Sequence, residues 1–266
     1  MTKCELNRIE LANFLSSFGP GIDDLRLDVK ENYLVGGVAA PTHFLTKKIS
    51  VTQIEGGGFV IADLSKVSAF LRACSGETVE LHQQERDGSA QSLRISCGKS
   101  VVNLPPTKDV KSSKSLPTAM KLVDDAVATN WEKWVDKDLC CNAIVKVDDI
   151  FAVSSLGKVV GADKPYHLSF VADKKEMIIH TGSGVTGQMF HTVTIDPVLK
   201  PIGSELEINS EDKVYKTSFG PWFPDVVSCL PSGKAQVYTG DGTVLIFNHQ
   251  EKHCLLVVID QDLAQE

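Results

Sequence analysis

A few residue groups in this chain have types and spacings that can carry chemistry, and each has a plainer structural explanation. Residues 182–187, GSGVTG, match the glycine pattern of dinucleotide-binding loops. Such a loop must join a strand to a helix, so that the pyrophosphate meets the helix N-terminus. The following residues, QMFHTVTI, alternate polar and apolar side chains as a strand does. We therefore interpret the segment as a hairpin loop.

Histidine and cysteine pairs are the other candidates. His249 and His253 have the four-residue spacing that can hold a metal ion on a helix. They lie between two apolar β-rich runs, which favours a turn, and no third ligand is evident. Cys140 and Cys141 lack the C-x-x-C spacing and have no neighbouring histidine. We expect a protein that is not an enzyme and has no cofactor and no metal site.

Composition indicates a soluble protein of a reducing compartment. Apolar residues make up 42% of the 266 residues, which is enough for a large core, and no run is long enough to span a membrane. We expect no secretion signal at the N-terminus, and the odd number of cysteines, seven, fits a cytoplasmic protein. The net charge of −7 argues against a surface that is basic throughout but permits one basic face.

The elements that position these residues are mostly strands. Short β-rich runs alternate with turn residues throughout the chain, which predicts antiparallel hairpins. A few segments instead have a helical period, and Gly19 and Gly76 end the first two of them. The apolar stripes of these two helices are Leu11, Phe14, Leu15 and Phe18, and Val67, Phe70, Leu71 and Cys74.

The two halves of the chain share a pattern. Residues 13–29 resemble residues 152–171, since both place a helix ending in Ser-Ser-apolar-Gly before a loop and an alternating strand. Residues 59–82 have a weaker echo in residues 222–239. This self-similarity indicates two copies of one β-rich domain with two helices each, although chance matching of short patterns is a competing explanation.

We expect domain 1 at residues 1–104, a connector at 105–140 and domain 2 at 141–266. The connector begins rich in Pro, Ser and Lys and continues into a predicted amphipathic helix that carries Trp131 and Trp134. These tryptophans either anchor a partner or fix the connector to the body of the protein.

Cations recur on the open faces of the predicted helices. Arg72 points away from its helix's apolar stripe, and Lys66 lies at the edge of that stripe. Arg8 begins the first helix. On the third helix, Lys158 lies opposite a predicted buried side of Val153, Leu156 and Val160. A basic face and ordinary solvated charges both remain possible.

Five segments together resemble the DNA polymerase sliding clamps, most closely those of T4-like bacteriophages and more distantly proliferating cell nuclear antigen. The segments are LANFLSSFGPGIDDLRLDVKENYLV, GGFVIADLSKVSAFLRACSGETVEL, SVVNLPP, VKVDDIFAVSSLGKVVGADKPYHLSF and HCLLVVID. The resemblance spans nearly the whole chain but rests on pattern rather than on an invariant motif.

The resemblance implies an α+β fold of duplicated clamp domains, with antiparallel sheets outside and helices inside. Three two-domain chains would form a ring around duplex DNA and serve a replicative DNA polymerase and a clamp loader. Phosphates would be contacted without sequence readout. The candidate DNA-binding residues on the inner helices are Arg8, Lys66, Arg72 and Lys158.

The resemblance also implies two protein-binding surfaces. Strands at residues 99–104 and 188–195 would join neighbouring subunits, and a groove near the connector would take short apolar peptides of partners. The interface candidates are Val101, Val102, Phe190 and Val193. The groove candidates are Phe44, Val244, Val258 and Ile259.

Two other functions remain open on the sequence. A monomeric DNA-binding processivity factor of similar fold would bind DNA directly through one basic face. A β-rich binding module without a DNA function would share the fold pattern but not depend on the helix cations.

Overall fold

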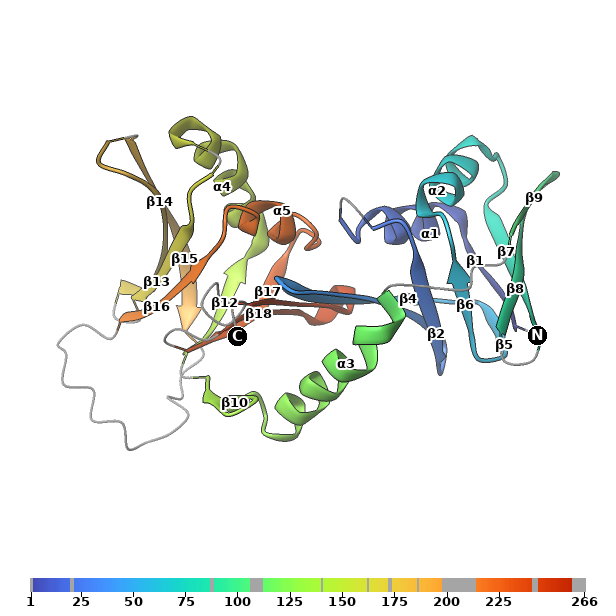
Figure 1. Cartoon of the computed structure of the whole chain (residues 1–266), viewed down its shortest axis with the longest axis horizontal. Helices are drawn as coiled ribbons and strands as arrows, with labels where there is room; N and C mark the ends of the chain where they lie inside the picture. Colours follow the sequence, from blue (N-terminus) through green and yellow to red (C-terminus); the bar gives the residue numbers. More distant parts are fainter. Residues whose placement is uncertain are drawn as a thin grey trace. The chain divides into compact units, whose positions relative to one another are not determined.

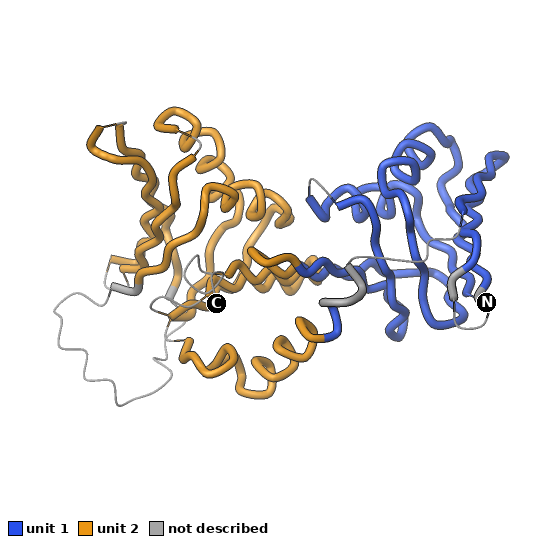
Figure 2. Tube along the Cα trace, in the orientation of Figure 1, with its two compact units in different colours: residues 1–39, 45–117 blue, residues 40–44, 118–266 orange. Residues whose placement is uncertain are grey.

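The computed structural model divides the chain into two compact units. Unit 1 comprises Met1–Ala39 and Leu45–Pro117, and unit 2 comprises Ala40–Phe44 and Thr118–Glu266 (Figure 2). No helix in the described part of the chain is long and apolar enough to cross a membrane. The structure describes residues 2–19, 22–86, 89–105, 112–139, 141–161, 163–171, 174–185, 187–197, 214–240 and 244–259.

Unit 1 is built from antiparallel strands and two helices, α1 (Arg8–Ser16) and α2 (Leu64–Ala73), which lie side by side (Figure 1). One sheet has the order β5-β1-β7-β8-β9 and the other has the order β4-β3-β2-β6. The strands are β1 (Thr2–Asn7), β2 (Leu25–Lys30), β3 (Tyr33–Ala40), β4 (His43–Ser50), β5 (Gln53–Glu55), β6 (Gly58–Ile61), β7 (Thr78–Arg86), β8 (Ser89–Cys97) and β9 (Ser100–Leu104).

Side-chain caps fix where the unit 1 helices begin. The Asn7 side chain accepts hydrogen bonds from the backbone N–H groups of Ile9 and Glu10 at the start of α1. The Asp63 side chain accepts one from the Lys66 backbone N–H at the start of α2. Such caps satisfy donors that have no partner within the helix. The positions of both helices therefore follow from local sequence as well as from their buried stripes.

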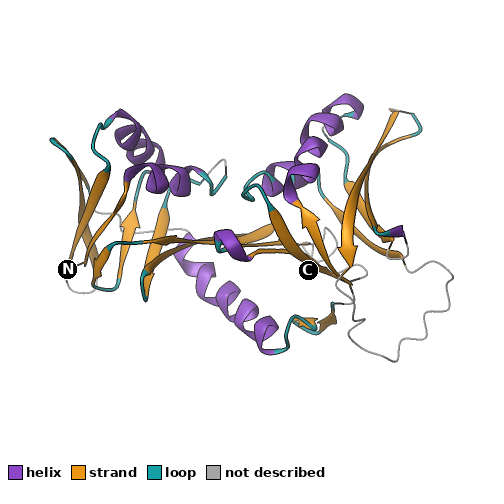
Figure 3. Cartoon of the chain, turned by 180° about the vertical axis from the view of Figure 1, so that it is seen from behind, coloured by secondary structure: helices purple, strands orange, loops and turns teal. Residues whose placement is uncertain are grey.

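Unit 2 repeats the pattern with one larger sheet, whose order is β16-β13-β14-β15-β12-β17-β18-β19. Helices α4 (Val147–Val160) and α5 (Phe223–Val227) pack together in this unit (Figure 3). The strands are β12 (Cys141–Lys146), β13 (Tyr166–Val171), β14 (Glu176–Ser183), β15 (Gly187–Pro197), β16 (Val214–Phe219), β17 (Lys234–Thr239), β18 (Val244–His249) and β19 (Cys254–Ile259).

The internal duplication has a structural counterpart. In unit 1, β1 runs directly into α1, and α2 leads into β7. In unit 2, β12 runs directly into α4, and α5 leads into β17. Each unit thus has a long strand followed at once by a helix, and a second helix returns the chain to the strand next to the first.

The glycine-rich segment 182–187 and the pair His249 and His253 both lie at turns, as the sequence indicated. β14 and β15 form an antiparallel hairpin in which Ser183 pairs with Gly187, so the glycine-rich segment is a hairpin loop. His249 and His253 flank the short η2 turn (Gln250–Lys252) between β18 and β19. The described residues contain no group of three His, Cys, Asp or Glu side chains arranged to hold a metal ion.

The buried side of α4 differs from the prediction. Val153 is buried as expected, but Leu156 is 40% exposed and Val160 is half-buried. The other buried residues of the helix are Val147, Ile150 and Gly157. The stripe is rotated because Tyr166 packs directly over Gly157, where any side chain would meet the tyrosine hydroxyl. A glycine in a buried stripe gives no apolar signal in the sequence.

The connector also differs from the prediction. Helix α3 (Ser112–Ala128) ends before both tryptophans, since Asn130 and Trp131 adopt the left-handed backbone conformation, with φ of 52° and 62°. The chain then forms a small hairpin of β10 (Lys133–Trp134) and β11 (Lys137–Asp138). The Trp131 ring stacks on Tyr238 of β17, with ring centroids 5.1 Å apart. Trp134 is buried, so the contacts support the interpretation that the tryptophans fix the connector to unit 2.

We expect Gly157→Ala to lower the free energy of unfolding by about 1–3 kcal/mol, because the added methyl group overlaps the Tyr166 hydroxyl. Gly184→Ala is the matched control, since nothing lies within 4 Å of its added carbon, and it should change stability little. Urea unfolding measures both. Tyr166→Phe in the Gly157→Ala background should restore part of the loss, and an unchanged stability of Gly157→Ala would contradict the packing described.

Candidate nucleic-acid interface

Arg8 is held inside unit 1 rather than directed freely to solvent. Its Nε donates to the Gly76 carbonyl at 2.7 Å, and its Nη1 donates to the Leu71 carbonyl at 2.8 Å. These acceptors lie at and just beyond the C-terminal end of α2, where helix carbonyls lack partners and carry partial negative charge. Arg8 therefore joins the start of α1 to the end of α2, with two of its five N–H donors engaged there.

Lys47 has a similar structural role. Although it is a lysine, it is buried, and its Nζ donates to the carbonyl of Ser17, the C-cap of α1, at 2.7 Å. The ammonium also lies 5.8 Å from the centre of the Phe18 ring. Both helices of unit 1 thus end on a cation contributed by another element, and Lys47 is buried there and therefore unavailable to a phosphate.

Lys66 is exposed but paired. Its Nζ lies 2.8 Å from an oxygen of Asp63, the capping residue one turn earlier. The hydrogen bonds from the Lys66 side chain, its backbone N–H and the Ser65 hydroxyl lower the pKa of Asp63 to about 2, and the same carboxylate raises the pKa of Lys66. Lys66 is therefore charged at neutral pH and paired with a carboxylate of its own helix start.

Arg72 is the cation of α2 that faces solvent most freely. It is exposed in the last turn, opposite the buried Val67 and Leu71, as the helical period predicted. Within the described residues it has no hydrogen bond or ion pair. A guanidinium presents several donors in a fixed fork that matches a phosphate. Arg72 is thus the side chain of unit 1 best placed to contact a polyanion from a helix face.

The helix face of unit 2 carries little positive charge. Lys158 is exposed in the last turn of α4, without a partner among the described residues. The first turn carries Asp148, whose pKa is lowered by the Ser232 hydroxyl and the Gly233 N–H, and Asp149, which pairs with Lys146 at 3.8 Å. Helix α5 contributes Asp225 and no cation. The formal charges on these two helices do not favour a phosphate backbone.

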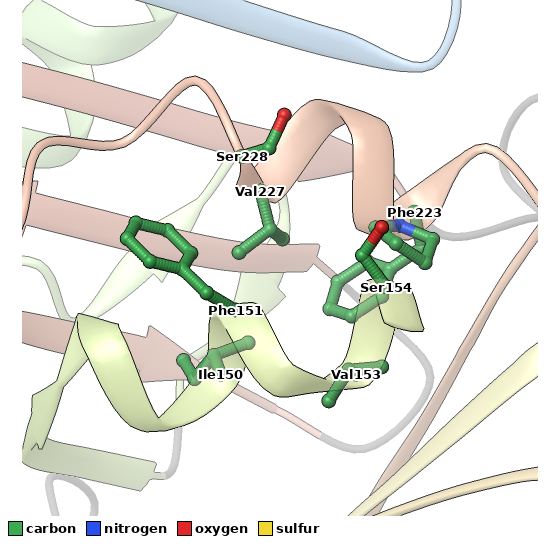
Figure 4. Close-up of a pocket in the computed structure, with 8 residues that line it drawn as sticks. Ile150, Phe151, Val153, Ser154, Phe223, Val227 and Ser228 are labelled. Atoms are coloured by element: carbon green, nitrogen blue, oxygen red, sulfur yellow. The ribbon is translucent and has the colours of Figure 1, made fainter. Parts of the chain in front are cut away.

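An open apolar depression lies between α4 and α5 (Figure 4). It measures about 130 Å³ and has no charged residue in its wall. Nearby on α4, Val159 is 82% exposed. This part of unit 2 suits apolar contact better than an anion. The lining residues are Ile150, Phe151, Val153, Ser154, Phe223, Pro224, Val227 and Ser228.

The four groove candidates lie on neighbouring strands of unit 2, but most are covered. Val244 pairs with Ile259 across β18 and β19, and the Ile259 N–H donates to the Thr42 carbonyl, two residues from Phe44. Phe44, Val244 and Val258 are each less than 5% exposed, and Ile259 is half-buried. The structure brings these residues together and leaves Ile259 as the one that a ligand can reach.

The interface candidates lie on strand edges. β9 is the last strand of its sheet, with Val101 46% exposed and Val102 half-buried. In β15, residues 187–194 pair with β14 alone, because β12 pairs only with residues 195–197. Phe190 is 63% exposed on this edge, whereas Val193 is buried under α4. Three of the four side chains are therefore accessible.

Sequence reasoning missed a row of rings on β13, β14 and β15. His167 pairs with His180, and His180 pairs with Phe190, so the three rings lie across three strands on one face. The ring centroids of His180 and Phe190 are 4.5 Å apart. Their alignment depends on the register of two hairpins, which the alternation of residues along each strand does not specify.

Comparison with solved structures assigns the fold. The chain superimposes on a putative DNA polymerase III beta subunit from Eubacterium rectale with a TM-score of 0.70 and 11% sequence identity over 97% of this chain. It matches the Helicobacter pylori beta clamp bound to a DNA ligase peptide with a TM-score of 0.63 and 12% identity over 98% of this chain. The chain spans just under two thirds of these proteins, 65% and 66% of their lengths.

The match to PCNA from Thermococcus kodakaraensis has a TM-score of 0.66 and 10% identity, and it covers 98% of this chain and 99% of that one. No family model matches the sequence, and no curated protein matches it. The chain therefore has the sliding-clamp fold, and the predicted α+β class of duplicated clamp domains is confirmed. At 10–12% identity the likeness concerns the fold, and the T4-like subtype stays a prediction.

We expect Arg8 and Arg72 to differ sharply in their effect on stability. Arg8→Met should lower the free energy of unfolding by about 1–3 kcal/mol, because it leaves the Leu71 and Gly76 carbonyls without their donor. Arg72→Met, the matched control, should stay within about 0.5 kcal/mol because the residue is exposed and unpaired. Urea unfolding of both variants decides, and equal effects would contradict the structural role of Arg8.

Proposed function

We propose that this chain is a subunit of a DNA sliding clamp, a ring-shaped processivity factor that encircles duplex DNA and tethers a replicative DNA polymerase. The observation that carries the proposal is the fold: two units of strand-helix-strand pattern that align along nearly the whole chain with PCNA and beta clamps. The proposed role is mechanical, without catalysis. We place it in the cytoplasm or nucleoid of the host cell, and the quoted sequence segments favour a T4-like bacteriophage clamp.

A homotrimer is the proposed assembly. The chain accounts for the full length of an archaeal PCNA, so we infer the same two-domain subunit, with domains at 1–104 and 141–266 joined by the connector at 105–140. β9 of one subunit and β15 of the next would pair along their free edges. Neither strand carries a charged residue or a proline along residues 100–104 or 187–195, the usual protections against edge pairing. The apolar contact between the two subunits would be made by Val101, Val102 and Phe190. Val193, which is buried, would support β15 from within its own unit.

Duplex DNA would be contacted mainly from unit 1. Arg72 is free and exposed, Lys66 contributes despite its pairing with Asp63, and Lys158 adds a single cation from unit 2. Arg8 acts by positioning α2 rather than by touching a phosphate. Few fixed ion pairs suit a ring that must slide, because strong phosphate contacts favour one position over the next.

Polymerase and clamp loader would bind through short apolar segments near Ile259. The Helicobacter pylori beta clamp holds a DNA ligase peptide, which shows that the fold can present such a site. In this chain a partner would contact Ile259 directly, while Phe44, Val244 and Val258 support the surface from the core. Covering an exposed apolar edge between two strands stabilises such a complex.

A monomeric processivity factor that binds DNA through one basic face is the competing proposal, because the fold alone does not specify an assembly. It conflicts with the small number of free cations on the described helices, since binding by charge alone requires several phosphate contacts.

We expect the chain at micromolar concentration to have a mass three times its 28.9 kDa, measured by light scattering after gel filtration. Phe190→Asp should shift the protein to single chains, because it places an unpaired charge at the edge of β15. Val185→Asp is the matched control, since Val185 is also highly exposed but lies in the hairpin loop. A single-chain mass for the unaltered protein would contradict the ring.

Charge reversal tests the DNA face. We expect Lys66→Glu with Arg72→Glu to weaken loading onto linear duplex DNA and to reduce the slope of log affinity against log salt by about one for each lost phosphate contact. Lys30→Glu with Lys3→Glu makes the same change of charge on exposed strand positions of unit 1 and should have a much smaller effect. Equal effects of the two pairs would contradict a DNA face on α2.

A further inference from the structure

The outer face of unit 2 carries an ordered row of side chains that ends at the free edge of β15. Reading across the sheet, Ser218, His167, His180 and Phe190 are successive register partners on β16, β13, β14 and β15. The Nδ1 of His167 lies 2.7 Å from the Ser218 hydroxyl oxygen. The row is thus tied at one end, while Phe190 at the other end is 63% exposed.

The rings in this row are stacked. The planes of His180 and Phe190 are inclined by 14° at a centroid distance of 4.5 Å, and those of His167 and His180 by 28° at 5.8 Å. Offset ring pairs at such distances contribute beyond the area that they bury. Phe190 is therefore held against His180 in one orientation, which makes it a pre-ordered contact rather than a mobile exposed side chain.

We propose that His180, in the row Phe190–His180–His167, makes the contact between two copies of this chain sensitive to acid. The proposal rests on the clamp function, because it concerns the joint between subunits. The occupant is argued from this chain's own surface. β9 ends its sheet with Val101, 46% exposed, on the outward side of an uncharged edge. Pairing β9 with β15 would place that apolar side chain beside Phe190.

The expected sensitivity to acid follows from the surroundings of the His180 nitrogen that would take up a proton. The Nε2 of His180 is buried and has no hydrogen-bond partner among the described residues. Burial and the neighbouring His167 lower the pKa of His180. A second copy covering Phe190 removes more water from His180, which disfavours the charged ring further. The joint therefore binds fewer protons than the separated chains, and association weakens as the pH falls through the pKa of the free histidine.

Other charged groups on this outer face are few. β14 contributes Glu176, β15 contributes Asp196 and β16 contributes Lys216, while β13 contributes His167 itself. None of the three charged residues lies in the row, and His191 on β15 points to the opposite face, where its Nε2 contacts the Asp149 carbonyl oxygen. Within the described part of the chain, no carboxylate is placed to stabilise a charged His180.

Self-association at about pH 8 and about pH 5.5, on either side of the usual histidine pKa of about 6.5, tests the proposal. Sedimentation velocity over a dilution series measures the affinity of the joint. We expect it to weaken at the lower pH, but by less than about tenfold, because burial and His167 already hold the pKa of His180 below its usual value in the separated chain. His180→Phe, which keeps the stack but cannot be protonated, should remove this dependence.

His253→Asn is the control, because it removes a histidine from a turn outside the row at a left-handed position that asparagine tolerates. It should behave as the unaltered chain does. If His180→Phe fails to fold, His180→Gln makes the same comparison. Equal affinity at both pH values, or a His180 variant as acid-sensitive as the original, overturns the role of the row and leaves the ring intact. Single chains at both pH values overturn the row and the proposed ring together.

Discussion

Burial of one stripe of each helix against its sheet is the constraint on which the rest of this structure depends. A helix cannot rotate about its axis without exposing that stripe, so the stripe also decides which polar side chains face water. In α2, burying Val67 and Leu71 leaves Arg72 in solvent. In α1, burying Leu11 and Leu15 places Arg8 against the end of α2, where it becomes a donor to two carbonyls. Packing therefore decides that Arg8 holds two helices together and that Arg72 faces solvent, where a ligand can reach it.

The faces and ends of the helices could be predicted from the sequence where the apolar pattern was strong. The period in α2 predicted the exposed Arg72 because its apolar residues form a single stripe. In α4 the buried stripe passes through Gly157, whose role is to admit the Tyr166 ring, and no apolar count detects that. The end of α3 was missed because Asn130 and Trp131 stop the helix through backbone conformation rather than through a glycine or proline.

For the candidate site, too, the sequence predicted some features and missed those that depend on long-range contacts. The resemblance to sliding clamps named the four groove residues, but it could not show that three of them are buried, because burial depends on what covers the strands. The resemblance likewise made Arg8 a candidate for DNA binding, and it could not show the hydrogen bonds of Arg8 to α2, which span more than 60 positions in the chain. The row of rings on unit 2 depends on two hairpin registers. Long-range contacts, rather than local pattern, account for each difference.

Few cations are free on the described helices α1, α2, α4 and α5, and the net charge is −7, which suits the proposed ring because it would hold DNA by enclosing it rather than by attraction alone. Retention on circular duplex DNA tests this claim most directly. Chains assembled in the presence of a nicked circle should co-elute with it in high salt and should be released when a restriction enzyme cuts the circle, because a closed ring can leave only over an end. Loss of the protein from the intact circle as salt rises, or retention after cutting, would contradict enclosure.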